Sequence, residues 1–153
     1  MTGFVSTPPA PGPAVVANDG WWPDLDAARA REAVKLETTV SAERLNDALV
    51  AAIITVNREF AAWRAALLPA PASLELVPAP EIAGESERVF LYRRAVYATA
   101  KADLDEGYRG TDTAGAGQAR ADALTPVIAD FRRQARDAVR DFLGRPRVIA
   151  ELI

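Results

Sequence analysis

The sequence predicts a mainly α, four-helix bundle-like subunit with an extended Pro-rich N-terminal arm and a strand-like C-terminal tail. Two observations support this fold class. Apolar residues recur at alternating steps of four and three over residues 41–68 and again over residues 124–142, which is the period of an amphipathic helix. The 11 Pro residues are clustered between long Pro-poor stretches. The predicted parts are an arm (residues 1–20), one helical domain (21–144) and a tail (145–153).

The composition excludes several classes of function. The 153 residues include neither Cys nor His, which removes disulfides, thiolate metal sites, thiol nucleophiles and the commonest general base. We therefore expect no enzyme, no metal and no cofactor. No apolar run is long enough to cross a membrane, and the N-terminus does not resemble a signal peptide. We expect a soluble protein of the cytoplasm, with no membrane partner.

The first predicted elements are the arm and a short helix. Residues 6–13 (STPPAPGP) favour polyproline-like extension over helix or central strand. After a turn at residues 18–20, Pro23 suits the start of a helix, and we expect that helix over residues 24–36. Trp21 and Trp22 are adjacent and point in different directions. We expect at most one to bury fully, leaving the other as a candidate partner contact.

The fold is organised around a long helix over residues 41–68. Ser41 is a natural N-cap and Pro69 ends the run. At 1.5 Å per residue this helix would be roughly 40 Å long. Its apolar stripe comprises Leu45, Leu49, Ala52, Val56, Phe60, Trp63 and Leu67.

A Pro-rich break over residues 69–83 follows, with residues 74–77 (LELV) as its only strand-like piece. The third helix is expected over residues 84–107. It is apolar on most sides, which indicates a helix that is central in its domain or shared with a neighbouring subunit.

The fourth helix follows a Gly-rich connection over residues 108–117 and reaches about residue 143. Pro126 should kink it or mark a restart capped by Thr125. Gly144 is a good C-terminal stop. The expected apolar stripe comprises Leu124, Val127, Phe131, Ala135, Ala138 and Phe142.

Basic residues gather near the end of the chain. Six Arg and two Asp lie within residues 132–147. Three of the Arg share one helical face, and a solvated face remains the simpler interpretation. The functional alternative is contact with an acidic protein surface or with DNA phosphates. The candidates are Arg132, Arg136, Arg140 and Arg147, together with Arg93 and Arg94 on the third helix.

The C-terminal tail carries too many apolar groups to be left in water. It either folds back or adds to a neighbouring subunit, and the neighbour is the preferred interpretation. Its candidate contact residues are Val148, Ile149, Leu152 and Ile153.

An ordered set of segments resembles the phage head completion protein (GPL) family. The resemblance covers about residues 18–153, and it is the order and spacing of the segments that make it specific. The segments are residues 18–24 (NDGWWPD), 39–45 (TVSAERL), 57–59 (NRE), 63–64 (WR), 84–86 (GES), 91–97 (LYRRAVY), 119–122 (ARAD), 132–133 (RR), 138–141 (AVRD) and 144–153 (GRPRVIAELI).

This resemblance implies a structural virion protein of contractile-tailed phages. Such a protein adds to the portal vertex after DNA packaging and forms a ring, typically of twelve copies, that receives the tail. The implied partners are other copies, the portal protein, a tail-side neck or terminator protein and the packaged DNA. The implied location is the virion neck, after assembly in the host cytoplasm. Pro126 and the Pro-rich linker depart from the family pattern.

Two other functions remain open at this point. One is a DNA-binding helical protein that uses the basic face of residues 132–147. The other is a helical adaptor of an unrelated host complex.

Overall fold

The computed structural model describes residues 15–111 and 116–147. Within these ranges the chain forms four α-helices, two ladders of two antiparallel strands and a short 3-10 helix. The mainly α fold class is therefore confirmed. The helices are α1 Ala27–Ala33, α2 Ala42–Ala65, α3 Glu87–Thr111 and α4 Ala116–Phe142; the strands are β1 Val15–Val16, β2 Leu25–Asp26, β3 Glu81–Ile82 and β4 Glu85–Ser86; the 3-10 helix is Leu74–Leu76.

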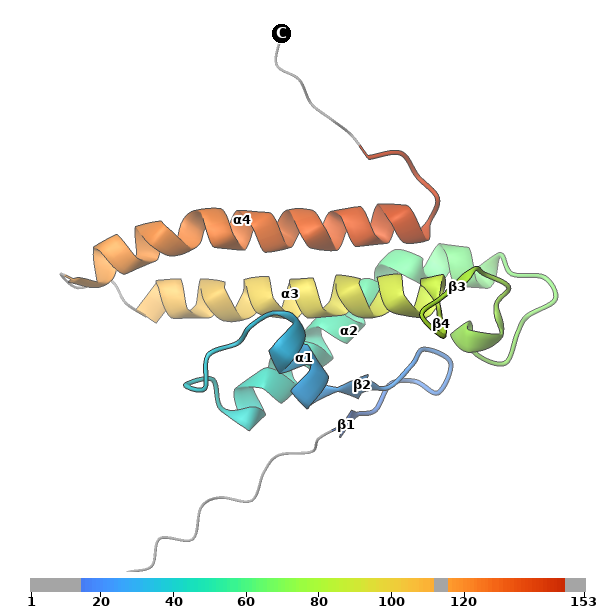
Figure 1. Ribbon diagram of the computed structural model, residues 1–153, viewed down its shortest axis with the longest axis horizontal. Coiled ribbons are helices and arrows are strands. Elements are labelled where there is room, and N and C mark those ends of the chain that lie inside the picture. Colours follow the sequence, from blue (N-terminus) through green and yellow to red (C-terminus); the bar gives the residue numbers. More distant parts are fainter. Residues whose placement is uncertain (1–14, 112–115, 148–153) are drawn as a thin grey trace, which may run out of the picture.

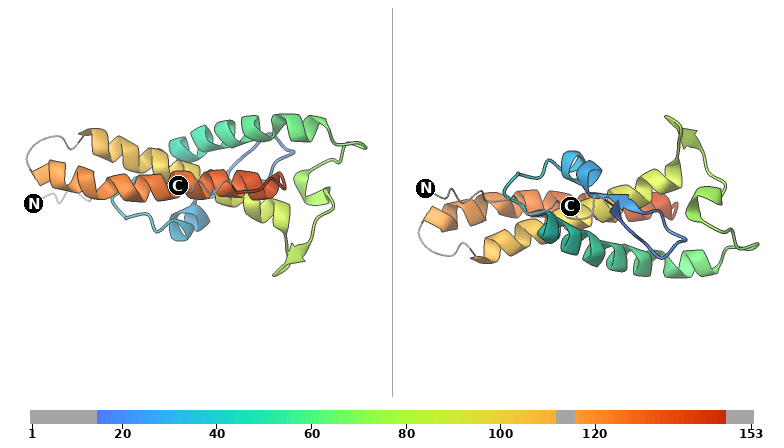
Figure 2. Two further views of the ribbon diagram at one scale, coloured as in Figure 1. Left: turned by 90° about the horizontal axis from the view of Figure 1, so that it is seen from above. Right: turned by 90° about the horizontal axis from the view of Figure 1, so that it is seen from below.

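The three long helices form an elongated bundle with α3 at its centre. Figure 1 shows α4 antiparallel to α3 along one side, α1 below α3, and α2 crossing behind α3. Figure 2 shows the same bundle from above and below, with its long helices inclined to one another. Tyr92, Ala95 and Val96 of α3 are fully buried. Of the two interpretations of this apolar helix, a central position is confirmed.

The long helix α2 forms much as its sequence predicts. Ser41 caps it, because the Ser41 hydroxyl accepts a hydrogen bond from the Arg44 amide at 3.2 Å. The helix ends at Ala65, three residues earlier than expected. Five residues of the predicted stripe are buried, and Trp63 and Leu67 are partly buried against the same core. The buried five are Leu45, Leu49, Ala52, Val56 and Phe60.

Helix α1 is shorter than predicted at both ends. Leu25–Asp26 pairs with Val15–Val16 as a strand, so the backbone is still extended where the helix was expected to begin. Asp26 is the N-cap instead of a residue near Pro23, and it accepts hydrogen bonds from two amides of the first turn. The helix ends in a left-handed turn at Lys35, whose φ is 49°. The amide of Leu36 then bonds back to the Arg31 carbonyl at 2.9 Å, which closes a Schellman motif.

The Pro-rich connection holds two elements that the sequence pattern does not predict. Residues 74–77 were expected to be strand-like, but Leu74–Leu76 is a 3-10 helix whose Leu74 is fully buried. Strands β3 and β4 form a tight hairpin before α3. Ala83 and Gly84 at its turn both have positive φ (55° and 75°), as a two-residue type I′ turn requires.

Helices α3 and α4 are both longer than predicted. α3 continues to Thr111, through part of the expected connection, and residues 112–115 of that connection lie outside the described residues. α4 is one helix through Pro126, so a restart capped by Thr125 does not occur. Its apolar face differs from the predicted stripe, because Val127 is exposed and Ile128 is buried in its place.

The two chain ends only partly fall within the described residues. Val15–Val16, which the sequence assigns to the arm, pairs with Leu25–Asp26 as a short antiparallel strand. Gly144 has a φ of 65° and ends α4 as expected, with the Arg145 amide bonded to the Arg140 carbonyl at 2.8 Å. Residues 1–14 and 148–153, which hold most of the predicted arm and tail, lie outside the described residues. The three-part division of the chain stays a prediction.

Candidate functional site

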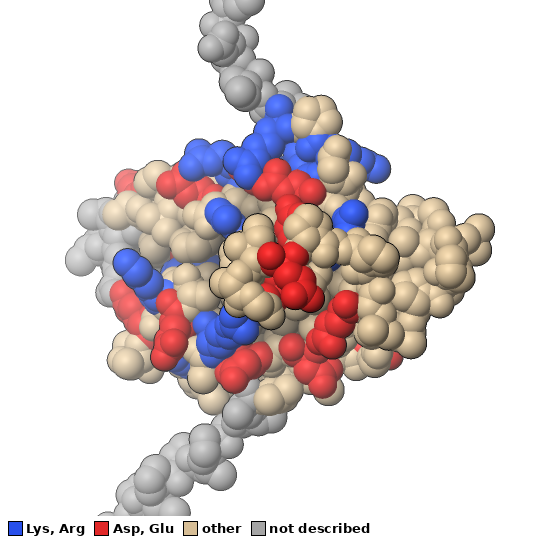
Figure 3. All heavy atoms as spheres, turned by 45° about the vertical axis from the view of Figure 1, so that its right-hand side comes forward, with Lys and Arg blue, Asp and Glu red and all other residues tan. Residues whose placement is uncertain are grey.

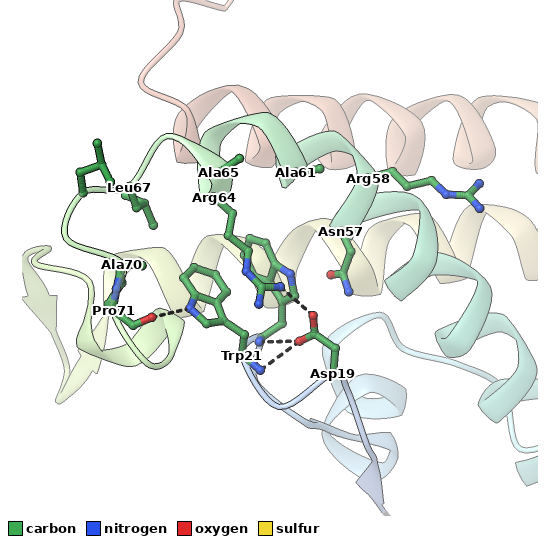
Figure 4. Close-up of a pocket in the computed structure, with 12 residues that line it drawn as sticks. Asp19, Trp21, Asn57, Arg58, Ala61, Arg64, Ala65, Leu67, Ala70 and Pro71 are labelled. Carbon is green, nitrogen blue, oxygen red and sulfur yellow. Dashed lines mark hydrogen bonds and ion pairs between the residues drawn. The ribbon is translucent and has the colours of Figure 1, made fainter.

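The turn at residues 18–24 closes over one end of the bundle, and both of its tryptophans are buried. Trp21 is 8% exposed and Trp22 is 3% exposed. The Trp21 indole N–H donates to the Pro71 carbonyl at 2.8 Å (Figure 4). The Leu74 amide donates to the Trp21 carbonyl at 3.0 Å. The expectation that at most one tryptophan buries fully was wrong, because the Pro-rich connection packs against Trp21 as well.

Trp22 belongs to an aromatic cluster that joins the turn to three helices. Its ring stacks on Tyr92 of α3, with 4.8 Å between centroids, and packs against Phe60 of α2 at 5.6 Å. Phe60 in turn stacks on Phe142 at the end of α4, at 4.0 Å. Trp63 meets Phe142 edge-on at 4.7 Å. Pairs of this geometry stabilise a core beyond their buried area.

Three polar side chains close a hydrogen-bonded ring beside this cluster. The Tyr92 hydroxyl donates to Asn57 Oδ1 at 2.6 Å and accepts from Asn18 Nδ2 at 2.8 Å. Asn57 Nδ2 donates to Asn18 Oδ1 at 3.0 Å. Burial raises the pKa of Tyr92 well above its ordinary value, so the hydroxyl keeps its proton as donor. The ring ties the turn, α2 and α3 together at one point.

Asp19 holds the outer side of the turn. Its Oδ1 accepts from the amides of Trp21 and Trp22, and its Oδ2 pairs with Arg64 at 2.7 Å. Burial alone would raise the pKa of Asp19, but the Trp22 amide, Arg64 and the Trp21 amide together lower it below 3.8. The Arg64 guanidinium also lies over the Trp21 ring, 4.4 Å from its centroid.

An open cleft of about 680 Å³ lies between this turn, α2 and the Pro-rich connection (Figure 4). Its polar groups include Asp19, Arg58, Arg64 and Asn57, and the rest of its lining is mainly apolar. Asp19 stays ionised at neutral pH and already accepts three hydrogen bonds. It therefore does not suit proton transfer, and the cleft is better suited to binding than to catalysis.

The predicted basic candidates divide into paired and unpaired groups. Arg93 makes a bidentate ion pair with Glu85, which lowers the pKa of the Glu85 carboxyl. Arg132 lies 2.9 Å from Asp103 and 2.5 Å from Glu106. Arg147 pairs with the last acidic residue of α4 at 2.5 Å. These three are neutralised within the subunit.

The other three basic candidates, Arg94, Arg136 and Arg140, make no ion pair with any residue that the structure describes. Figure 3 shows Lys and Arg side chains gathered at the top of the molecule, around the end of α4. The predicted common face of Arg132, Arg136 and Arg140 is therefore only partly a free positive surface.

The last four candidate contact residues belong to the C-terminal tail. Val148, Ile149, Leu152 and Ile153 lie outside the described residues. Within the described ranges, no helix is long and apolar enough to span a membrane.

Sequence reasoning did not assign a role to Asn18, Asn57 or Asp19. A polar residue directly beside an apolar stripe is a signal for a buried hydrogen bond, and Asn57 stands next to Val56 in the stripe of α2. Its partners are 35 and 39 residues away, so the pattern along the helix could not name them.

Comparison with known proteins points in one direction. A sequence model described as "Phage head completion protein (GPL)" matches residues 16–153. The chain is 39% identical to the head completion/stabilization protein of Escherichia phage P2 over 146 residues, which cover 95% of this chain and 86% of that protein. No solved structure matches the chain. The chain belongs to the phage head completion protein (GPL) family.

Proposed function

We propose that the chain is a structural virion subunit that forms a ring on the portal vertex after DNA packaging and provides the tail attachment site. The main support for this proposal is the family match across residues 16–153. A similar protein is also named a head completion/stabilization protein. The proposed partners are other copies (twelve, from the family resemblance), the portal protein, a tail-side neck or terminator protein and DNA in the channel. The proposed location is the virion neck, after assembly in the host cytoplasm.

The shape of the subunit supports this role. β1, where the described chain begins, lies on the α1 side of the bundle, and the described end after α4 lies on the opposite side (Figure 1). Segments that continue from these two points start on different faces and can reach different neighbours. Contacts between two different surfaces of identical subunits close into a ring when the rotation between copies allows it.

Deletion of residues 148–153 tests the proposed role of the tail. The truncated subunit keeps every described element, so we expect unchanged helical content by circular dichroism. In a phage that lacks its own copy of the gene, the truncated subunit should fail to give DNA-filled heads that join tails. Glu151→Gln, which keeps the four apolar tail residues, is the control and should complement. Normal heads and tails with the truncated subunit would refute the proposal.

A second candidate function rests on the unpaired Arg94, Arg136 and Arg140, which could bind DNA phosphates. Removing one cation that binds a phosphate reduces the slope of log affinity against log salt by about 0.9. We therefore expect Arg136→Gln with Arg140→Gln to flatten that slope by about 2. Arg132→Gln, at a paired site, should change it less. Absence of DNA binding at low salt would remove this candidate.

A further inference from the structure

A groove of about 360 Å³ lies where α1, α3 and α4 meet, on a different face from the cleft beside the tryptophans. We call it the α1–α3–α4 groove. Its floor is apolar: Tyr97 and Ala98 of α3 and Val34 after α1 are buried beneath it. Phe131 of α4 lies partly buried along one side. Phe90, at its edge, is 46% exposed, which is high for a large aromatic side chain.

The rim of this groove is positive. Arg29 and Arg94 line it, and Arg93 beside them is neutralised by Glu85. Arg29 reaches the same Glu85 only at 3.9 Å, with most of its side chain in water. Arg94 makes no ion pair with the described residues. An apolar floor beside Arg94, which no described carboxylate pairs with, fits an aliphatic segment that carries one carboxylate.

Residues 148–153 (VIAELI) have this composition, with four aliphatic side chains and a single acidic one, Glu151. The chain before them already turns back beside α4. Gly144 takes a left-handed conformation. The Arg147 guanidinium then donates two hydrogen bonds to the Asp141 carboxylate, at 3.1 and 2.5 Å. Arg147, and to a smaller extent Arg94, hold the pKa of Asp141 low.

The tail is long enough to cover the groove of its own subunit. From Asp141 back to Gln134, which lines the groove, is seven residues of helix, or about 10 Å. Six extended residues span about 20 Å. A segment tethered this close has an effective concentration in the millimolar range, so even a weak apolar contact would be populated.

We propose that residues 148–153 dock into the α1–α3–α4 groove of their own subunit before assembly, with aliphatic side chains on Phe90 and Glu151 at the Arg94 rim. Docking removes apolar surface of both the tail and the groove from water. This docking does not depend on the proposed ring, because it concerns the free subunit.

The absence of cysteine from the chain allows a direct cross-linking test. The test variant carries Gln134→Cys at the groove and Ala150→Cys in the tail, which leaves the four aliphatic residues and Glu151 intact. The control variant carries Glu59→Cys and Ala150→Cys. Glu59 is exposed on α2, next to Phe60, whose ring stacks on Phe142. It therefore lies level with the end of α4, within reach of the tail, and is not part of the groove.

Under mild oxidation of dilute protein, we expect the test pair to form a disulfide within one chain about tenfold faster than the control pair. Adding Phe90→Ser to the test variant should reduce its rate to that of the control. Equal rates in the two double-Cys variants would overturn the proposal. Cross-links mainly between differently tagged chains would also overturn it, because the occupant would then be a second copy.

Discussion

At the scale of single residues, the turn over the bundle end depends on polar atoms that hydrogen-bond to one another in a partly buried setting. The Tyr92 hydroxyl, the two asparagine amides and the Asp19 carboxylate each have partners from other elements or from the turn itself. A buried polar group that loses its partner costs more than the bond itself contributed. The site is therefore sensitive to small changes that leave its shape intact.

Tyr92→Phe removes one hydroxyl from the closed ring and leaves the shape of the aromatic cluster unchanged. Asn57 Oδ1 loses its donor and Asn18 Nδ2 loses an acceptor, so we expect the free energy of unfolding to fall by about 1–3 kcal/mol. Urea denaturation measures this loss. Tyr97→Phe is the control, because its hydroxyl makes only a 3.3 Å bond to the Asp26 carbonyl and should cost less. Equal losses would contradict the importance of the ring.

Asp19→Asn tests the charge of the turn through pH. The folded-state pKa of Asp19 is lowered from 3.8, so its stabilising contribution is present above that value and is lost as pH falls through the folded pKa. We expect the difference in urea midpoint between the wild type and the Asn variant to be largest above about pH 5. It should shrink as pH falls below about 3.8. Glu59→Gln, at an exposed position, is the control for loss of one acidic charge; a pH-independent difference at Asp19 would contradict the prediction.

At the scale of elements, the helices follow their local signals except where the chain forms long-range contacts. Ser41 and Gly144 begin and end helices as expected. α1 begins late because Leu25–Asp26 pairs with β1, although Pro23 is a suitable helix start. α4 continues through Pro126 because it packs along α3, which compensates for the hydrogen bond that Pro cannot donate.

Pro126→Ala should stabilise the protein. Pro126 is exposed within α4, so little packing is lost, and Ala restores an amide donor and removes the ring from the preceding turn. We expect the free energy of unfolding to rise by about 1–3 kcal/mol, with a higher melting temperature. Pro146→Ala, beyond the end of α4, is the control and should change it by less than about 0.5 kcal/mol. An unchanged or lower stability at Pro126 would show that α4 needs the proline.

At the scale of the whole molecule, large apolar side chains remain exposed on the connection between α2 and α3. Leu68 is 92% exposed, and Leu76 and Ile82 are 65% and 68% exposed. Residues 65–74 carry no charge at all. By contrast, Figure 3 shows basic side chains gathered around the end of α4. Exposed apolar side chains in one segment are typical of protein contact surfaces.

Replacing Leu68, Leu76 and Ile82 together by Ser tests this surface. These side chains bury little in the subunit, so the free energy of unfolding should change by less than about 1 kcal/mol. If the connection contacts a neighbour in the head, recovery of DNA-filled heads in a complementation assay should fall at least tenfold. A matched variant, Val50→Ser with Ile54→Ser on the exposed side of α2, should complement better. Equal recovery in both variants would assign no assembly role to the connection.

The amino-acid sequence is sufficient to predict the mainly α class, the cap and apolar stripe of α2 and the family resemblance. These follow from periodicity and capping, which act over one or two turns of helix, and from the ordered motifs. Only the packed structure shows that α3 is central and that both tryptophans are buried. It also shows that Arg93 and Arg132 are neutralised and that Asn57 closes a ring with Asn18 and Tyr92. Those outcomes depend on partners up to 74 residues away, and no local pattern carries that information.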